Sequence, residues 1–455
     1  MIRLTRSLLV TLAFAGVLPG LAGATTHTVF PTVVATYTEP PCTLFASPTG
    51  TAGATGSSPT TPTSLAGART KSVAGSIVCL LAGTYGLSST FYVSKSGTAG
   101  QPIVYRAYGG TALLRWTGSS PPAGSAYPVV QVGSGTHDVE FHALTIDGSN
   151  RASTGMKCDI GVRRLVVRES TIKNTGSAGI VAKGCDYVTL VGNLISHTGY
   201  DPNVGWSSAI TLNSDRWSDT APGFHNFVVG NVISGASDES SNHSEGHGVI
   251  VDRGYNGPSV LIANNVVFEN GGRCLDAYLS AHVWFVNNTC YKSALDLRHK
   301  AKLAEITGKG ASATDLHFVD NVAFAWTGKP PYGLLDGAAG GFSHNVEYGG
   351  TTSCVPSSVL ADPLQLRRAD PFFASPPPVD PTLDQQQRTA LLPWNIGSRL
   401  TPQAASPLID AGIDPRTVAG VTPELRAGMD RFLGTDIAGA VRPSGIGWDI
   451  GAYER

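Results

Sequence analysis

Four segments of the sequence share a short pattern that would place polar side chains in two columns on one outer face. Each segment has a small residue, an apolar residue and three further positions, and they are 179–183 (GIVAK), 209–213 (AITLN), 248–252 (GVIVD) and 274–278 (CLDAY). Side chains alternate between the two faces of a strand, so the positions one and three after an inward apolar residue point outward. The outward columns are then Val181, Thr211, Ile250 and Asp276, and Lys183, Asn213, Asp252 and Tyr278.

Two outward residues are candidate bases for a β-elimination. A lyase that cleaves a uronic-acid polymer removes the proton next to a carboxylate, and it needs a cation or donor to neutralise that carboxylate. Lys183 is the favoured base and Tyr278 is the alternative, with Asn213 orienting the substrate carboxylate. Arg273 or Arg298 would then carry the carboxylate charge.

Carboxylates near the columns allow two other chemistries. Asp238, Glu239, Glu245 and Asp252 could supply the hard oxygen ligands of a calcium ion. A glycoside hydrolase instead needs a carboxylate pair, which Asp252 and Asp276 could form, joined by Glu245 or Asp215.

Extra residues occur at 197–205, 214–222, 236–247 and 296–302, which predicts loops that wall a groove beside the columns. Aromatic side chains beside a polar trough can stack on sugar rings. The predicted substrate-binding residues are Asn213, Trp206, Trp217, His247, His299 and Lys300.

A repeated asparagine indicates which elements position these residues. It occurs in VGNLIS (Asn193), VGNVIS (Asn231), ANNVVF (Asn265), VNNTCY (Asn288), VDNVAF (Asn321) and SHNVEY (Asn345), at intervals of 38, 34, 23, 33 and 24 residues. The short intervals match one coil of a β-solenoid, and the long ones match a coil with an inserted loop. Asparagine amides stacked from coil to coil would satisfy buried polar groups at one corner. We therefore predict nine to eleven stacked coils and little helix.

The rest of the chain is consistent with an exported solenoid. Residues 1–24 have Arg3 and Arg6 before an apolar run and an A-x-A site, which predicts a signal peptide. The seven cysteines would then oxidise, with Cys42–Cys79, Cys158–Cys185 and Cys274–Cys290 as candidate pairs and Cys354 left over. The net charge of −1 gives no indication of a nucleic-acid partner, and no later apolar run is long enough to span a membrane. We expect a monomer.

Composition divides the chain into four parts. After residues 1–24, residues 25–75 are rich in Thr, Pro and Gly and are expected to form a lead-in and N-terminal cap. Residues 76–350 would form the β-helix, and prolines crowd into residues 351–455, which predicts an irregular C-terminal cap.

Several phrases resemble known proteins. The asparagine-headed strands, Leu81-Ala82-Gly83-Thr84-Tyr85 and Ser96-Gly97-Thr98 with Gln101-Pro102-Ile103 resemble the right-handed parallel β-helix, pectate-lyase-like superfamily. The ending, with Ser406-Pro407-Leu408-Ile409-Asp410-Ala411-Gly412, then Asp436, Arg442-Pro443 and Asp449-Ile450-Gly451-Ala452-Tyr453-Glu454, resembles the C-terminal motif of the choice-of-anchor Q proteins. The resemblance implies an all-β fold and includes lyases, hydrolases, epimerases and adhesins.

The favoured prediction is a secreted polysaccharide lyase or epimerase that acts on a uronate-containing polysaccharide, with calcium as a candidate cofactor. A polygalacturonase-like hydrolase is the first alternative, because Gly246-His247-Gly248 resembles part of that signature, although the preceding strand SSAITLNSD lacks the paired aspartates. A glycan-binding or surface protein without catalysis is the second alternative.

Overall fold

The computed structural model describes residues 39–122, 125, 127–299, 303–310, 312–334, 339–379 and 396–455. The expected signal peptide, the first part of the lead-in and Lys300 lie outside these residues. Among the residues that are described, no helix is long and apolar enough to cross a membrane.

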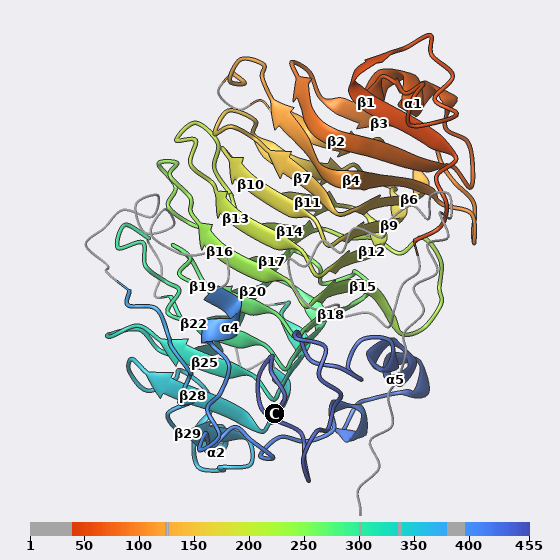
Figure 1. The fold of residues 1–455 in the computed structure, drawn as a ribbon. Coiled ribbons are helices and arrows are strands. Elements are labelled where there is room, and N and C mark those ends of the chain that lie inside the picture. The colour runs from red at the N-terminus through yellow and green to blue at the C-terminus, as the bar shows by residue number, and fades with distance from the viewer. Residues whose placement is uncertain are drawn as a thin grey trace, which may run out of the picture.

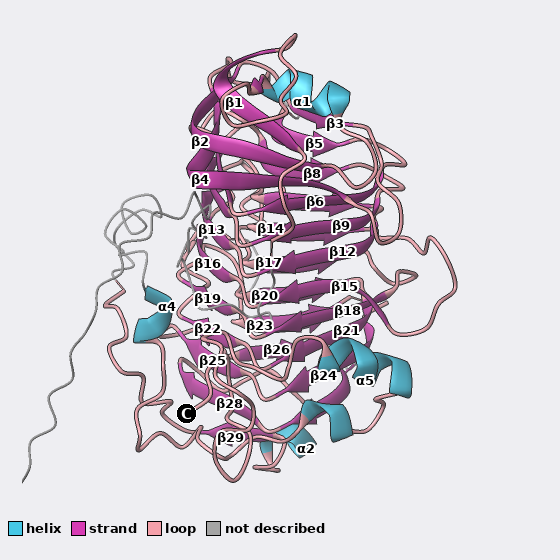
Figure 2. Cartoon of the chain, turned by 45° about the vertical axis from the view of Figure 1, so that its right-hand side comes forward, coloured by secondary structure: helices cyan, strands magenta, loops and turns pink. Residues whose placement is uncertain are grey.

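The chain winds into a right-handed parallel β-helix whose strands stack as successive rungs (Figures 1 and 2). One face is a nine-stranded parallel sheet. Its strands are β3 (Phe91–Val93), β5 (Pro128–Val132), β8 (Thr154–Cys158), β11 (Ile180–Lys183), β14 (Ile210–Asn213), β17 (Val249–Asp252), β20 (Leu275–Tyr278), β23 (Ile306–Lys309) and β26 (Tyr332–Leu334). The prediction of an all-β parallel β-helix is confirmed.

A twenty-stranded sheet forms the other two sides, because β2 (Ile77–Leu87) and β4 (Ile103–Trp116) are long enough to run round both. β1 (Leu44–Thr51) pairs with β2. One side holds β6 (His137–His142), β9 (Arg163–Arg168), β12 (Asp186–Val191), β15 (Phe224–Val229), β18 (Ser259–Ala263), β21 (Ala281–Val286), β24 (Thr314–Val319) and β27 (Ala339–Ser343). The other holds β7 (Leu144–Asp147), β10 (Thr171–Thr175), β13 (Leu194–Thr198), β16 (Val232–Ala236), β19 (Val266–Phe268), β22 (Thr289–Tyr291), β25 (Val322–Ala325), β28 (Asn345–Gly349) and β29 (Leu366–Arg368).

The asparagines form a continuous hydrogen-bonded ladder at the corner between these two sides. The Nδ2 of Asn193 donates to Oδ1 of Asn231 at 3.0 Å, and the same bond links Asn231 to Asn265 at 3.0 Å. The ladder continues through Asn288 and Asn321 to Asn345, and all six side chains are buried. The predicted stacking of amides is therefore confirmed.

The residue before each ladder asparagine has a left-handed backbone conformation, which explains why glycine, asparagine or aspartate often occurs there. Gly192, Gly230, Asn264, Asn287, Asp320 and His344 all have φ between 50° and 64°. Glycine, asparagine and aspartate adopt this left-handed conformation most readily, and it turns the chain sharply. The phrases VGN, ANN, VNN and VDN therefore encode both the turn and the ladder.

Replacing Asn265 with Leu tests the ladder. Asn265 accepts from the backbone N–H and the amide of Asn231, and it donates to Asn288 and to the carbonyl of Val228. Leaving these buried groups unpaired should lower the free energy of unfolding by about 1–3 kcal/mol. Denaturant titration measures this, with Asn256→Ala in an exposed turn as the control. Equal stabilities would contradict the role of the ladder.

Three disulfides cross-link the solenoid, two of them between neighbouring coils and the third between the residue before β20 and β22. They join Cys42 to Cys79, Cys158 to Cys185 and Cys274 to Cys290, as predicted, and Cys354 is a free, exposed thiol. Such a set of disulfides is typical of an extracytoplasmic protein.

The two ends of the solenoid are covered differently. At the N-terminal end, helix α1 (Leu65–Lys71) buries Leu65 and Ala68 against the central core. At the other end lie α2 (Ser357–Leu360) and β29. The following residues include α4 (Ile396–Arg399), a 3₁₀ turn (Pro415–Thr417) and α5 (Pro423–Asp430).

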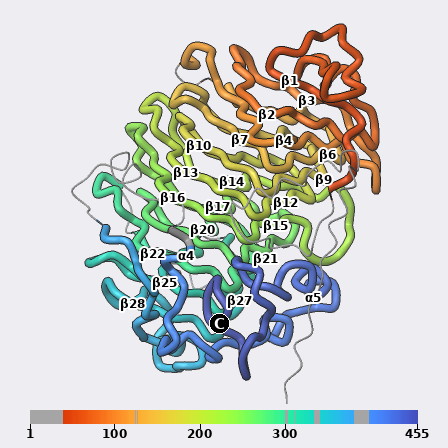
Figure 3. The backbone as a smooth tube through the Cα atoms, in the orientation of Figure 1, coloured from red at the N-terminus to blue at the C-terminus, as the bar shows by residue number. Residues whose placement is uncertain are grey.

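The C-terminal residues do more than cap the end. They return along the outside of the coils (Figure 3), where Phe432, Leu433 and Trp448 pack with Leu261 and Trp284. These residues pack on the later strands of the twenty-stranded sheet, and the hydrophobic cluster that they form includes no residue of the nine-stranded sheet.

Candidate functional site

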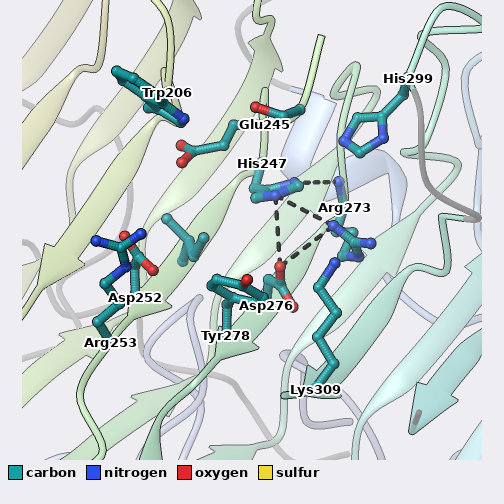
Figure 4. A pocket seen from close by; sticks show the side chains of 12 residues that line it. Trp206, Glu245, His247, Asp252, Arg253, Arg273, Asp276, Tyr278, His299 and Lys309 are labelled. Atoms are coloured by element: carbon teal, nitrogen blue, oxygen red, sulfur yellow. Dashed lines mark hydrogen bonds and ion pairs between the residues drawn. The ribbon is translucent and has the colours of Figure 1, made fainter. Parts of the chain in front are cut away.

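A pocket of about 290 Å³ lies on the outer surface of the nine-stranded sheet, over β17, β20 and β23 (Figure 4). Loops that lead into β14, β17 and β23 contribute to its wall. The lining residues are Trp206, Ser244, Glu245, His247, Ile250, Asp252, Arg253, Arg273, Asp276, Tyr278, His299 and Lys309. Its volume is at the lower end of the range for small-molecule sites.

The strand register confirms the predicted columns. Lys183, Asn213, Asp252 and Tyr278 are register partners on successive strands, and Tyr278 is followed by Lys309. The apolar residues assigned to the core are at most 1% exposed: Ile180, Ile210, Val249 and Leu275.

Lys309 is a pocket residue that the sequence interpretation missed. The segment 305–309 (EITGK) falls on the next coil and has the apolar residue followed by three positions, but its first residue is Glu305 and not a small residue. Extending the register by one strand would have found it. Its Nζ lies 5.2 Å from the centroid of the Tyr278 ring.

Three buried side chains form the floor of the pocket. His247 Nε2 and Arg273 Nη1 face the same Oδ2 of Asp276, at 3.5 and 3.4 Å. The backbone N–H of Arg273 donates to Nδ1 of His247 at 2.8 Å, so the proton of the neutral imidazole resides on Nε2 and points toward Asp276. Burial, reinforced by Arg273, keeps the pKa of His247 well below its usual value. The His247 ring is thus held in one orientation, and it is neutral.

Arg273 is held in this floor. It is 1% exposed, and its Nε also donates to Oγ1 of Thr307 at 3.2 Å. We assigned Arg273 to the substrate carboxylate, but in the structure its guanidinium faces Asp276. It is placed to position Asp276 and His247.

Glu245 is the strongest candidate acid in the pocket. Burial raises its pKa from 4.5 to about 8, with added repulsion from Asp252, Asp238 and Asp276, although Ser208 donates to its Oε2 at 2.9 Å. Glu245 therefore carries a proton at neutral pH. Proton donors in enzymes have pKa values close to the working pH, as here.

Asp252 is the other accessible carboxylate. Asn213 donates to its Oδ2 at 2.5 Å, and burial raises the pKa of Asp252 against the opposing effects of Asn213 and Arg253. The side-chain amide of Asn213, which was predicted to orient the substrate carboxylate, therefore binds Asp252 in this structure.

The pocket is net positive at neutral pH. Its three cations are Arg253, Arg273 and Lys309, and its carboxylates other than protonated Glu245 are Asp252 and Asp276. His247 is neutral, and burial lowers the pKa of His299 to about 4. Three cations outnumber two carboxylates even when both are ionised, and this balance favours an anionic ligand.

Charges in the long loops pair with one another instead of facing the pocket. Arg298 forms ion pairs with Glu239 at 2.9 Å and with Asp296 at 2.8 Å. Asp238 accepts the backbone N–H groups of Ser244 and Glu245 and the hydroxyl of Ser240. The assignments of Arg298 to the substrate and of Asp238 and Glu239 to calcium therefore conflict with these contacts.

The four carboxylates proposed for calcium do not converge. Among the described residues, three potential metal ligands have donor atoms within 4.8 Å of one another. They are Cys274, Cys290 and Glu305, and none of the four carboxylates is among them. The two sulfurs are joined in a disulfide. The donor set predicted for calcium does not fit, because Asp238 and Glu239 are held by backbone amides and by Arg298.

Two predicted residues lie away from the pocket. Lys183 is exposed and lies two strands from Asp252. Trp217 belongs to loop 214–222, which follows β14 and leads to β15, at the opposite edge from the loops that line the pocket. The indole N–H of Trp217 donates to the carbonyl of Asn256. The prediction that loop 214–222 walls the pocket is wrong, because inserted loops occur at both edges of the sheet.

Asp215 does not join a carboxylate pair. It is buried and accepts from the backbone N–H of Cys185 and from Asn226. Burial raises its pKa well above the usual value.

The comparisons with known proteins concern the fold. No family model and no curated protein matches the sequence. Among solved structures, pectate lyase Pel9A superposes with a TM-score of 0.57 at 18% identity, over 90% of this chain and 96% of that one. The Dettilon tailspike protein gives 0.38 at 13% identity over 63% and 50%, and a rhamnogalacturonan lyase gives 0.34 at 14% identity over 61% and 87%. The chain has a pectate-lyase-like right-handed parallel β-helix fold.

Proposed function

We propose that the protein is a secreted polysaccharide lyase that cleaves a uronate-containing polysaccharide by β-elimination. The observation that carries the proposal is the pocket itself, which brings Tyr278, Lys309 and protonated Glu245 together in a net positive site. The fold likeness to a pectate lyase supports the same class of substrate.

The proposed step uses each of these residues once. The phenolate form of Tyr278 takes the proton next to the uronate carboxylate and becomes the neutral phenol, and Lys309 and Arg253 neutralise the carboxylate while charge builds on it. The electron pair of the broken C–H bond forms the ring double bond, and the bond to the leaving sugar oxygen breaks. Glu245 gives its proton to that oxygen. An epimerase would share the proton abstraction and then return a proton to the opposite face of the sugar.

The test is to incubate the mature protein with a panel of polyuronates and neutral glycans. A lyase gives an unsaturated product that absorbs in the ultraviolet. We expect Tyr278→Phe to lower kcat on the active substrate by about 100-fold or more, because a general base contributes about 10²–10⁴-fold. The matched control is Tyr255→Phe, in the exposed turn after β17. Full activity of Tyr278→Phe would contradict the proposed base.

A hydrolase is the second candidate, because Glu245 and Asp252 line the same pocket as a protonated acid and a second carboxylate. Retaining and inverting glycosidases both use such a pair. New reducing ends without ultraviolet absorbance, abolished by Asp252→Asn, would establish this alternative. Binding without either product would indicate a glycan-binding protein.

A further inference from the structure

The accessible part of the nine-stranded sheet continues beyond the pocket. Asn213, Asp252, Tyr278 and Lys309 are partly exposed and Lys183 is exposed, so one column is open to solvent along its length. Over β14, β17 and β20 the neighbouring column is buried, with Thr211 7%, Ile250 3% and Asp276 1% exposed. The open column therefore forms a track across the strands, parallel to the axis of the solenoid.

The two ends of this track carry lysines. Lys309 and Lys183 are separated by four strand intervals, which is about 19 Å for strands spaced about 4.8 Å apart. The Lys183 ammonium forms no hydrogen bond or ion pair with the described side chains, although Lys157 on the preceding strand pairs with Asp159 at 3.0 Å. Lys183 is thus an available cation outside the pocket.

An exposed aromatic ring lines the end of the pocket nearer to β14. Trp206 is 71% exposed and precedes β14, the strand next to Lys183. Trp206 and Lys309 lie at opposite ends of the pocket in Figure 4. A sugar ring leaving the pocket toward β11 would pass an indole face before it reaches the ammonium of Lys183.

We propose that the polysaccharide chain lies along this track, that Trp206 stacks on a sugar ring at the edge of the pocket, and that Lys183 forms a distal subsite that binds a uronate carboxylate. The inference rests on the proposed function, since it assigns the extended part of the same substrate. Lys183 is then a residue that determines chain-length preference, and not the base that its sequence position indicated.

Chain length distinguishes this role from a general electrostatic effect. Only oligosaccharides that span from the pocket to Lys183 gain the distal contacts, so Lys183→Ala should weaken their binding and leave shorter oligosaccharides unaffected. An exposed ion pair changes affinity by about two- to fivefold, and added salt should remove the difference. Trp206→Ala should weaken binding of both long and intermediate chains, because the ring lies nearer the pocket.

The experiment measures binding of size-fractionated oligouronates by calorimetry in a Glu245→Gln background, which keeps the ligand intact. We expect the affinity of Glu245→Gln to rise with chain length, and Lys183→Ala to remove the last part of that rise. Lys157→Ala, on the same face and already paired with Asp159, is the matched control and should leave the rise unchanged.

The outcomes separate the two proposals. If long oligouronates bind and Lys183→Ala changes neither long nor short chains, or weakens both equally, the distal subsite is overturned and the proposed function stands. If no oligouronate of any length binds, the proposed function fails and the subsite with it.

Discussion

Glu245→Gln should reduce turnover by about 100-fold or more, since a positioned proton donor contributes about 10²–10⁴-fold to the rate. Glutamine keeps the shape of the side chain and can still accept from Ser208, but it has no acidic proton to give to the leaving oxygen. The same residue predicts the pH profile. Because the pKa of Glu245 is raised to about 8, activity of the wild-type protein should fall as the pH rises through about 8.

Steady-state rates should be measured across pH on the substrate that the panel identifies. They check both the lower turnover of Glu245→Gln and the fall of wild-type activity above about pH 8. Glu239→Gln is the matched control, because Glu239 pairs with Arg298 and does not line the pocket. Near wild-type turnover of Glu245→Gln, or an alkaline decline that persists in it, would show that another group donates the proton.

The same shift links Glu245 to stability. Its folded-state pKa lies above the value of 4.5 expected when unfolded, so its contribution is complete below about pH 4.5 and is lost as the pH rises through about 8. Glu245→Gln does not titrate. Relative to wild type it should therefore become more stable between pH 5 and pH 9, as denaturant unfolding at those two values would show.

Arg442→Met should lower the free energy of unfolding by about 3–5 kcal/mol, because removing one partner of a buried ion pair leaves the other charge uncompensated. Arg442 and Glu454 are both buried, and Nη1 of Arg442 lies 3.1 Å from Oε2 of Glu454. The guanidinium also donates to the carbonyls of Asp449 and Gly451. These residues belong to the ending that resembles the choice-of-anchor Q proteins, a resemblance that stays a prediction.

This ion pair also attaches the C-terminal residues to the coils. Arg442 Nη2 lies 3.4 Å from Oδ1 of Asn264, and the carbonyl of Asp449 accepts from Asn287. Equilibrium unfolding measures the loss, with Arg426→Met as the control, since the Arg426–Asp430 pair is exposed and its two charges lie 4.0 Å apart. A loss as small as the control's would mean that the C-terminal residues contribute little to folding.

The sequence predicts the solenoid well because its signals are local. The turn residue and the asparagine after it, such as Gly230 and Asn231, determine both the corner and the ladder. The alternation within each strand then places Asp252 and Tyr278 on the outer face, and paired cysteines one coil apart can be matched by spacing.

The site was predicted less completely because long loops decide it. Arg298 looks available in the sequence, yet the loop conformation pairs it with Glu239 and Asp296. Trp206 and Trp217 flank the same strand, but one precedes β14 and the other follows it, so only Trp206 reaches the pocket. Neither the raised pKa of Glu245 nor the floor of Asp276, Arg273 and His247 is visible before three coils are assembled.

The asparagine corner also constrains how such a protein can diversify. The connections 192–193, 230–231, 264–265, 287–288 and 320–321 are all two residues long, whereas the interval between ladder asparagines ranges from 23 to 38 residues. The extra residues of the longer coils therefore lie at the other two corners, where a longer loop does not disturb the register of the rungs. Loops at those two corners can thus be exchanged with loops of related β-helices to change the residues around the pocket. The asparagine corner would keep the strands of such chimaeras in register.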